Sequence, residues 1–305
     1  MALDYDTFRA QLTTAIPHLS RRVEDGARYV LDHPDDVVAF SMRDVARRAG
    51  VSPATLTRLT DAIGLAGGWA ALKALHVAHF RRVPPAYADR AAQVIERDDT
   101  TALIEACFDA ARLNLDHTQG ANRARAFAEA AAILAGARRV CVSAFLSCRA
   151  PGHTFAYVAR MLRDNVMLLG EGSSLAADLQ GLGPEDAVLS INFRPYGREI
   201  DQIAAAVRDS GARLVCLSDS RVTPLTPLAQ SVLVFSPESP SFFPSLTATT
   251  AAVEALLAAM LGQMGEDART RIAAIEQRLY SSGTYAAKPE ADPPAGHQTD
   301  EGTRR

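Results

Sequence analysis

The segment SMRDVARRAGVSPATLTRLTDAI, residues 41–63, decides the fold of the N-terminal part of this 305-residue chain. Each half of the segment places its apolar residues at helical spacing, so that they share one face. These apolar positions are Val45, Ala46 and Ala49 in the first half, and Leu56, Leu59 and Ile63 in the second. The pattern predicts two short amphipathic helices that share a small core.

The residues between the two predicted helices favour a tight turn. Gly50 has no Cβ atom and can adopt the left-handed conformation that ends the first helix, and Val51 then fills the corner. Ser52 is a good N-cap and Pro53 fits the first helical position, so the second helix starts sharply. This order of residues is typical of a helix-turn-helix unit, whose second helix enters the major groove of DNA. An ordinary helical hairpin in a larger domain is the alternative.

Positive charge exceeds negative charge around this segment. Between Ser41 and Arg82 there are seven Lys or Arg residues against two acidic residues, whereas the whole chain carries a net charge of −3. Contact with phosphate groups and the release of counterions require such a local excess of positive charge. The charge pattern therefore favours DNA binding over a purely structural hairpin.

The outward positions of the second predicted helix are candidates for DNA contact. We expect Ser52 and Thr55 to face phosphate groups, and Ala54, Thr57 and Arg58 to face base edges. Arg58 is the strongest single candidate, because an arginine can bind guanine through two hydrogen bonds. The expected DNA-binding residues are Arg43, Ser52, Ala54, Thr55, Thr57, Arg58 and Lys73.

Helical patterns flank the segment on both sides. Residues 5–33 have apolar residues at helical spacing up to Pro34, and the part from Val23 to His33 is expected to close a three-helix core. Residues 69–82 predict another amphipathic helix. Trp69, at its start, is interpreted as a core or hinge anchor rather than as a base-stacking residue.

Proline-rich and polar stretches divide the chain. Val83-Pro84-Pro85 stiffens the exit from the first unit and marks its end. The tail from residue 286 is polar and Pro-rich, and we expect it to be disordered. The predicted organisation is a helix-turn-helix domain over 1–83, a linker over 84–99, an effector-binding domain with leading helices over 100–285, and a tail over 286–305.

The pattern changes after two Ala-rich helices, expected over 100–118 and 122–135, which suit helix packing. Five short apolar, β-branched runs alternate with helical segments, as in a parallel sheet covered on both faces. The runs are RRVCVSA at 138–144, NVMLLG at 165–170, AVLSIN at 187–192, RLVCLSD at 213–219 and SVLVFSP at 231–237. The predicted fold class is α plus α/β: an all-helical N-terminal domain and a doubly wound five-stranded domain, closed by helices over 248–264 and 267–280.

Ligands of such sheets bind outside the carboxyl ends of the strands. The segments to consider are therefore 143–147, 192–199, 218–220 and 240–245. Arg194 and Arg198 could bind a carboxylate or phosphate through paired hydrogen bonds, or could simply pair with neighbouring acids at a helix start. His153 is interpreted as structural rather than catalytic. Phe242 and Phe243 fit a loop over the ligand, a subunit interface or plain packing.

The order of parts resembles the RpiR-like bacterial transcriptional regulators, which join an N-terminal helix-turn-helix domain to a C-terminal sugar isomerase (SIS) domain. The resemblance covers about residues 12–280, and its most specific portion is SMRDVARRAGVSPATLTRLTDAIGLAGGWAALK. It implies a five-stranded α/β domain that senses a phosphorylated sugar and shifts a dimer between DNA-binding states.

The ligand motifs of that family are altered here. Ser143, Phe145 and Ser147 match the Gly-x-Gly-x-Ser turn, so only the serine is kept. In the second motif, Ser-x-Ser-Gly-x-Thr-x-Glu, the matching residues are Asn192, Arg194, Pro195, Gly197 and Glu199, and only the glutamate is kept. The run Phe193-Arg194-Pro195-Tyr196 resembles a subset of the family. The expected effector-binding residues are Ser143, Ser147, Asn192, Arg194, Tyr196, Glu199, Ser218 and Ser245.

These observations predict a ligand-responsive transcription factor rather than an enzyme. Its expected partners are a double-stranded DNA operator, a small anionic sugar-derived effector and further copies of the chain in a homodimer or homotetramer. A sugar-phosphate isomerase that uses Glu199 as its base is one alternative. A regulator that uses the SIS domain only for oligomerisation is another.

A regulator of this kind is expected to have no cofactor and no catalytic residue. No metal site is expected either, because the four cysteines lack metal-ligand spacing. They are interpreted as buried free thiols in a reducing cytosol, which predicts a cytoplasmic protein. The N-terminus lacks a signal-peptide pattern, and no apolar run is long enough to cross a membrane.

Overall fold

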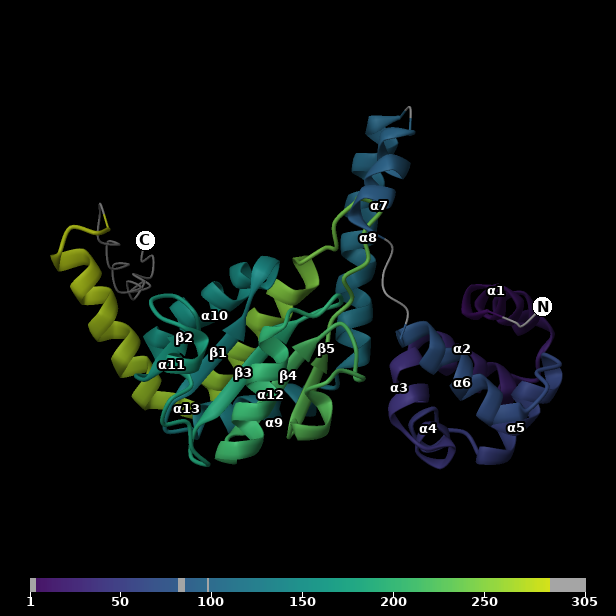
Figure 1. Ribbon diagram of the computed structural model, residues 1–305, viewed down its shortest axis with the longest axis horizontal. Helices are drawn as coiled ribbons and strands as arrows, with labels where there is room; N and C mark the ends of the chain where they lie inside the picture. Colours follow the sequence, from purple (N-terminus) through teal and green to yellow (C-terminus); the bar gives the residue numbers. More distant parts are fainter. Residues whose placement is uncertain (1–3, 82–85, 98, 286–305) are drawn as a thin grey trace, which may run out of the picture.

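The computed structural model describes residues 4–81, 86–97 and 99–285 (Figure 1). The predicted boundary at residues 83–85 and the predicted tail from 286 lie outside these described residues. An N-terminal helical part is followed by a C-terminal part built on one sheet, as predicted.

The N-terminal part consists of short helices around one apolar core. The helices are α1 (Tyr5–Ala15), α2 (Arg21–Asp32), α3 (Pro34–Ala39), α4 (Met42–Arg48), α5 (Pro53–Ala62) and α6 (Gly68–Arg81). Phe8, Leu12, Val30, Leu56 and Leu59 are fully or almost fully buried in the core. Helix α3 was not predicted: Pro34 ends α2, but its ring also suits the first position of a new helix.

Helices α4 and α5 are joined by the turn that the sequence predicts. Gly50 has a φ of 67°, and the Val51 amide donates to the Ala46 carbonyl at 2.9 Å. The Ser52 hydroxyl accepts a hydrogen bond from the Thr55 amide at 3.2 Å, which caps α5. These local interactions set the angle at which α5 leaves α4.

The predicted linker contains a helix that the sequence analysis missed. Residues Tyr87–Ile95 form α7, which is followed by α8 (Thr100–Ala121) and α9 (Ala124–Ala135). Arg90 of α7 donates hydrogen bonds to the carbonyl oxygens of Ser239 and Ser241, at 2.9 and 2.8 Å. The stretch after the Pro-Pro pair is thus attached to the C-terminal part rather than being a free connection.

The C-terminal part holds a five-stranded parallel sheet in the order β2-β1-β3-β4-β5, which confirms the predicted fold class. All five strands lie within the predicted runs. The strands are β1 (Val140–Ala144), β2 (Val166–Leu168), β3 (Ala187–Asn192), β4 (Arg213–Ser218) and β5 (Ser231–Val234).

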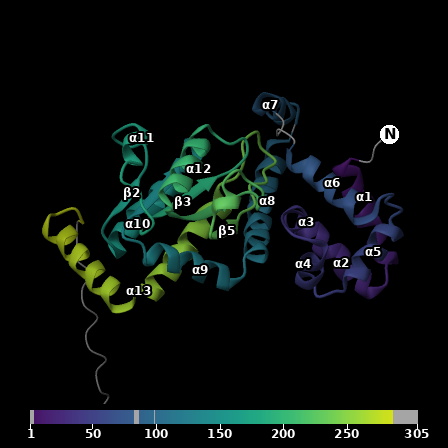
Figure 2. The ribbon, with the colours of Figure 1, turned by 60° about the horizontal axis from the view of Figure 1, so that its bottom comes forward.

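Helices cover both faces of the sheet (Figures 1 and 2). On one face α9, α10 (Arg149–Leu162) and α13 (Thr247–Ser281) pack on strand residues such as Val142 and Leu189. On the other face α12 (Glu199–Ser210) packs on Cys141 and Cys216, and the short α11 (Leu175–Asp178) contacts the same apolar cluster through Leu175. The non-helical Gly265 (φ 59°, ψ −133°) divides α13 near the predicted break between two helices.

Polar side chains of α8 cover the open edge of β5. Asn122 donates to the Val234 carbonyl and accepts from the Val234 amide, while Thr118 accepts from the Ser236 amide. Asn114 accepts from the Ser236 hydroxyl at 2.7 Å. Asn114 and Thr118 of α8 and Asn122, the C-cap directly after it, are spaced four apart, so they form one buried polar stripe that binds the end of β5 and the loop after it. The sequence predicts that α8 suits packing, and these hydrogen bonds to the end of β5 are a structural contact that its apolar pattern does not indicate.

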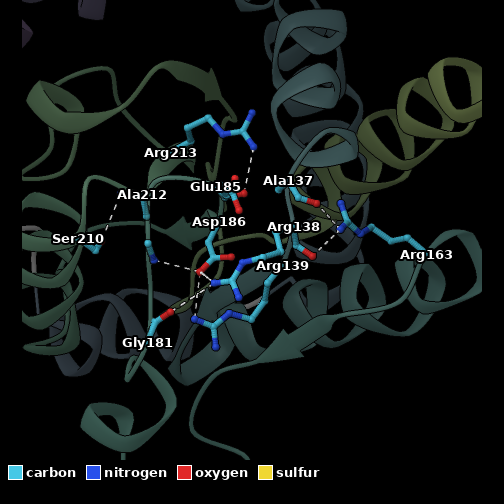
Figure 3. A network of polar contacts seen from close by, with 11 residues as sticks. Ala137, Arg138, Arg139, Arg163, Gly181, Glu185, Asp186, Ser210, Ala212 and Arg213 are labelled. Atoms are coloured by element: carbon cyan, nitrogen blue, oxygen red, sulfur yellow. Dashed lines mark hydrogen bonds and ion pairs between the residues drawn. The ribbon is translucent and has the colours of Figure 1, made fainter.

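A buried carboxylate fastens the amino ends of the strands (Figure 3). Asp186 is fully buried, and its Oδ2 atom accepts from Arg138 at 2.8 Å, from Arg139 at 3.2 Å and from the Gly183 amide at 3.0 Å. Arg163 donates to main-chain carbonyls of the same edge, among them that of Ala137. This network is structural, because ligand sites of parallel sheets lie at the opposite edge.

All four cysteines are free, and Cys141, Cys148 and Cys216 are buried as predicted. The expectation that Cys107 is also buried was wrong, because this residue of α8 is partly exposed. Among the described residues, no helix is both long and apolar enough to span a membrane.

We predict that Asp186→Asn lowers the free energy of unfolding by about 2–3 kcal/mol, because it leaves the partly buried Arg139 without a countercharge. Urea unfolding measures this change. Glu129→Gln, which breaks the exposed Arg125–Glu129 pair, is the control and should cost less than about 0.5 kcal/mol. Equal losses in both variants would contradict a stabilising role for the buried carboxylate.

Candidate functional site

A cavity of about 480 Å³ opens at the carboxyl ends of β1 and β3. Strand order reverses between these two strands, and such switch points are where parallel sheets bind ligands. The lining residues come from the end of β1 and the turn after it, the end of β3 and the segment after it, α7 and the loop before α13. They are Tyr87, Ser143, Phe145, Leu146, Ser147, Cys148, Ser190, Ile191, Asn192, Phe193, Pro195, Gly197, Glu199, Ile200 and Phe243.

The register of the sheet aligns the polar residues of the cavity floor. Ser143 of β1 lies opposite Ser190 of β3, and Asn192 of β3 lies opposite Ser218 of β4. The Asn192 amide donates to the Ser190 hydroxyl at 3.0 Å, and the Ser218 hydroxyl donates to Asn192 Oδ1 at 2.9 Å. Buried hydrogen bonds therefore fix the orientation of the Asn192 side chain at the floor of the cavity.

The walls of the cavity are largely aromatic. The ring centroid of Phe243 lies 6.4 Å from that of Phe193 and 5.0 Å from that of Tyr87. The loop over 240–245 thus contributes to the cavity through Phe243, whereas Phe242 is exposed on its surface. Tyr87 could not be assigned to the site from the sequence, because nothing there predicts that the linker packs on the sheet.

The ionisable groups of the cavity are few. Among the described lining residues, Glu199 is the one carboxylate, and there is no Lys, Arg or His. Burial raises the pKa of the Cys148 thiol to about 12, so this cysteine is protonated at neutral pH and is a poor nucleophile. The cavity can therefore bind a ligand through hydroxyl, amide and main-chain groups and through contact with rings.

The predicted effector-binding residues do not all lie together. Ser143, Ser147, Asn192 and Glu199 line the cavity, and Ser218 lies directly behind Asn192. The structure places the other three outside the lining: Arg194, Tyr196 and Ser245. Ser245 instead precedes α13, where its hydroxyl contacts Thr247.

Arg194 and Tyr196 are turned away from the cavity toward Asp219. The Arg194 Nε atom lies 2.8 Å from Asp219 Oδ2, and the Tyr196 hydroxyl donates to Asp219 Oδ1 at 3.4 Å. Burial and the neighbouring Asp219 raise the pKa of Tyr196, so its hydroxyl stays protonated and remains a donor. Pairing with an acid was the alternative that the sequence left open for Arg194, although with nearer acids than Asp219.

The second candidate site is the exposed surface of α4 and α5. Arg43, Ser52, Ala54, Thr57 and Arg58 are exposed there. Two other predicted DNA-binding residues are differently placed. Thr55 is only 6% exposed and its hydroxyl contacts that of Ser52, and Lys73 donates to the Phe40 carbonyl at 2.9 Å. The expectation that Thr55 points outward was wrong, because at the start of α5 it lies on the face that packs inward.

Comparisons with known proteins agree with this architecture. Residues 133–259 match the family model of the SIS domain. The sugar isomerase domain of an RpiR transcription factor from Sphaerobacter thermophilus is 24% identical, with a TM-score of 0.55 over 58% of this chain and 99% of that one. NanR from Vibrio vulnificus, solved with ManNAc-6P, is 16% identical, with a TM-score of 0.54 over 90% of this chain and 98% of that one.

A comparison with curated proteins gives no match. The two solved structures are 24% and 16% identical to this chain, and at such identities the structural likeness shows a shared fold. Residues 133–259, which match the SIS domain model, carry the five-stranded sheet and the cavity at the carboxyl ends of β1 and β3, and this fold is consistent with an SIS domain.

Helix α10 packs closely against β1, next to the strand end that opens into the cavity. Gly152 is buried in α10, and a Cβ atom at this position would lie 2.3 Å from the Cβ of Ala144. We predict that Gly152→Ala pushes the helix away and lowers the free energy of unfolding by about 1–3 kcal/mol, as measured in urea. At Gly120 of α8 an added Cβ meets nothing within 4 Å, so Gly120→Ala should be neutral or stabilising. A neutral Gly152→Ala would contradict the close packing.

Proposed function

We propose that this protein is a DNA-binding transcriptional regulator whose SIS domain senses a small sugar-derived anion, with α5 as the recognition helix. The observation that carries the proposal is the exposed row of Ala54, Thr57 and Arg58 on a helix that begins directly after a tight turn. The fold of a regulator such as NanR, which extends over most of this chain, supports the same reading.

The expected effector is a sugar phosphate or a related anion. NanR was solved with ManNAc-6P. The cavity of this chain offers the hydroxyls of Ser143 and Ser147, the latter in the short turn Leu146–Cys148 that precedes α10. With no described cationic residue in the lining, hydroxyl and main-chain donors would have to bind the anion.

An isomerase is the weaker proposal. Aldose–ketose isomerisation requires a base and usually also an acid that opens the ring. Glu199 is the one candidate base among the described lining residues, and His153 lies exposed on α10, outside the lining. We therefore propose a sensor without enzymatic activity. A regulator that binds no ligand remains the third hypothesis, which a ligand panel tests.

We further propose that the protein acts as a homodimer or homotetramer. Ile104 and Phe108 of α8 are 54% and 64% exposed, and Leu115 is 38% exposed on the same helical face. An apolar stripe of this kind supports association, which palindromic operators require of a protein with one recognition helix per chain.

We predict that Arg58→Ala weakens binding to an operator selected from random duplex DNA by about 1–3 kcal/mol, which is about 5- to 150-fold in Kd. Fluorescence anisotropy at fixed salt measures the change. Arg125→Ala, which removes an exposed arginine from α9, should leave the Kd unchanged. Unchanged affinity in Arg58→Ala would remove α5 as the recognition helix.

We predict that at least one member of a panel of pentose and hexose phosphates raises the Tm by about 5 °C at a concentration 100 times its Kd. Ser147→Ala should reduce this shift, whereas Ser245→Ala should retain it, since Ser245 lies outside the cavity. A panel without any shift would favour the ligand-independent regulator, and a full shift in Ser147→Ala would place the effector elsewhere.

A further inference from the structure

The segment after β3 has two different faces. Phe193, Pro195 and Gly197 line the SIS cavity. The residues between them, Arg194 and Tyr196, contact Asp219 instead. A displacement of the cavity wall therefore moves the two side chains that hold Asp219.

The segment after β4 carries the connection to the N-terminal helices. The Ser220 hydroxyl, fully buried, donates to Asp35 Oδ1 at 3.2 Å, and the Arg221 Nε atom lies 3.2 Å from Asp36 Oδ1. Asp35 and Asp36 belong to the first turn of α3. Both views of the molecule place α3 beside α8 (Figures 1 and 2). Three consecutive residues, Asp219 to Arg221, thus join the cavity wall to α3.

Arg221 is held firmly on the sheet side of this junction. It donates to the Val232 carbonyl at 3.0 Å and to the Ala121 carbonyl at 2.8 Å, and its side chain is only 17% exposed. The Arg221 guanidinium therefore contacts β5, the end of α8 and Asp36 at once, so that a movement of β5 or of the end of α8 would displace the group that pairs with Asp36.

Asp36 also contacts one of the proposed DNA-binding helices. It is 5% exposed, accepts a hydrogen bond from the Tyr29 hydroxyl of α2, and lies 3.6 Å from Arg48 at the end of α4. Arg48 also stacks over the Phe40 ring, with 3.8 Å between its Cζ atom and the ring centroid. One buried carboxylate thus contacts the SIS domain through Arg221 and helix α4 through Arg48.

The pKa of Asp35 at this junction depends on opposing effects. Burial, reinforced by the nearby Asp219 carboxylate, raises the pKa of Asp35 to about 7, against the opposing effects of Ser220 and Arg221. The charge state of Asp35 is therefore sensitive to any movement of Asp219.

We propose that Asp219, Ser220 and Arg221 couple occupancy of the SIS cavity to the position of α3 and α4. A ligand against Phe193 or Pro195 displaces Arg194 and Tyr196, which shifts Asp219 and loosens the contacts of its two neighbours with α3. The inference rests on the proposed function, since it requires the cavity to hold a ligand and α4–α5 to bind DNA.

A second route runs through α7 and serves as the competing explanation. Tyr87 of α7 lines the cavity, and Arg90 fastens α7 to the loop that carries Phe243. A ligand that moves α7 would pull on the chain that leads to α6 without any change at Asp219.

The test fills the cavity without requiring a known effector. Ser147→Phe places a ring in the cavity of the full-length protein, and hydrogen exchange of residues 34–48 reports on α3 and α4. We expect exchange about tenfold faster than in the wild type, as for the loss of one charge-assisted hydrogen bond. In the Asp219→Ala background, where the connection is already cut, Ser147→Phe should add less than about twofold.

Further variants keep the outcome decisive. Ser147→Leu replaces Ser147→Phe, and Arg194→Ala replaces Asp219→Ala, if thermal melts show that a variant is not folded. Arg208→Ala, on the exposed side of α12, is the control and should exchange like the wild type. The proposal would be overturned if Ser147→Phe had the same effect on exchange in the wild type and in Asp219→Ala. If that effect disappeared in Arg90→Ala instead, the coupling would be assigned to α7. No effect of the filled cavity on residues 34–48 would also overturn the proposal.

DNA binding separates this inference from the proposed function. If the protein binds an operator but filling the cavity does not change hydrogen exchange at residues 34–48, only the coupling is refuted. If filling the cavity changes hydrogen exchange at residues 34–48 but the protein binds no operator, the proposed function is refuted. The junction would then serve another output.

Discussion

The parallel order β2-β1-β3-β4-β5 is the constraint on which the rest of the SIS domain depends. It makes the chain leave β1 and β3 on opposite sides, so that the two segments after these strands part and leave room for a cavity. The same order brings Ser143 opposite Ser190 and Asn192 opposite Ser218. At the other edge, the buried Asp186 fastens the strands through Arg138 and Arg139. The stabilising ion pairs thus lie at the amino ends of the strands, and the cavity lies at their carboxyl ends.

The segment from Phe193 to Gly197 departs most from the family motif, and the structure gives the departure a physical meaning. Every second residue faces the cavity, and the residues between them contact Asp219. Arg194, which the sequence predicts as an anion-binding residue, is instead the partner of the Asp219 carboxylate. The altered motif combines the wall of a ligand site with a contact toward the proposed DNA-binding part.

Much of the fold was predictable from the sequence, because periodicity and caps are local properties. The five strands, the break in α13 near Gly265 and the turn at Gly50 all follow from residues within a few positions of one another. Helix α7 was not predictable, since it is held by contacts of Arg90 with a loop far along the chain. The burial of Thr55 likewise depends on which side of α5 meets the core.

The sequence by itself determined the two-part organisation, the type of each part and the candidate edge of the sheet, because these follow from spacing and from the rule that ligands bind at carboxyl ends of parallel strands. Only the tertiary structure decided which side chains share the cavity. Arg194 and Glu199 are five residues apart, yet one meets Asp219 and the other lines the cavity. The direction of a side chain in an irregular segment depends on partners distant in sequence, here Asp219, and no local pattern specifies them.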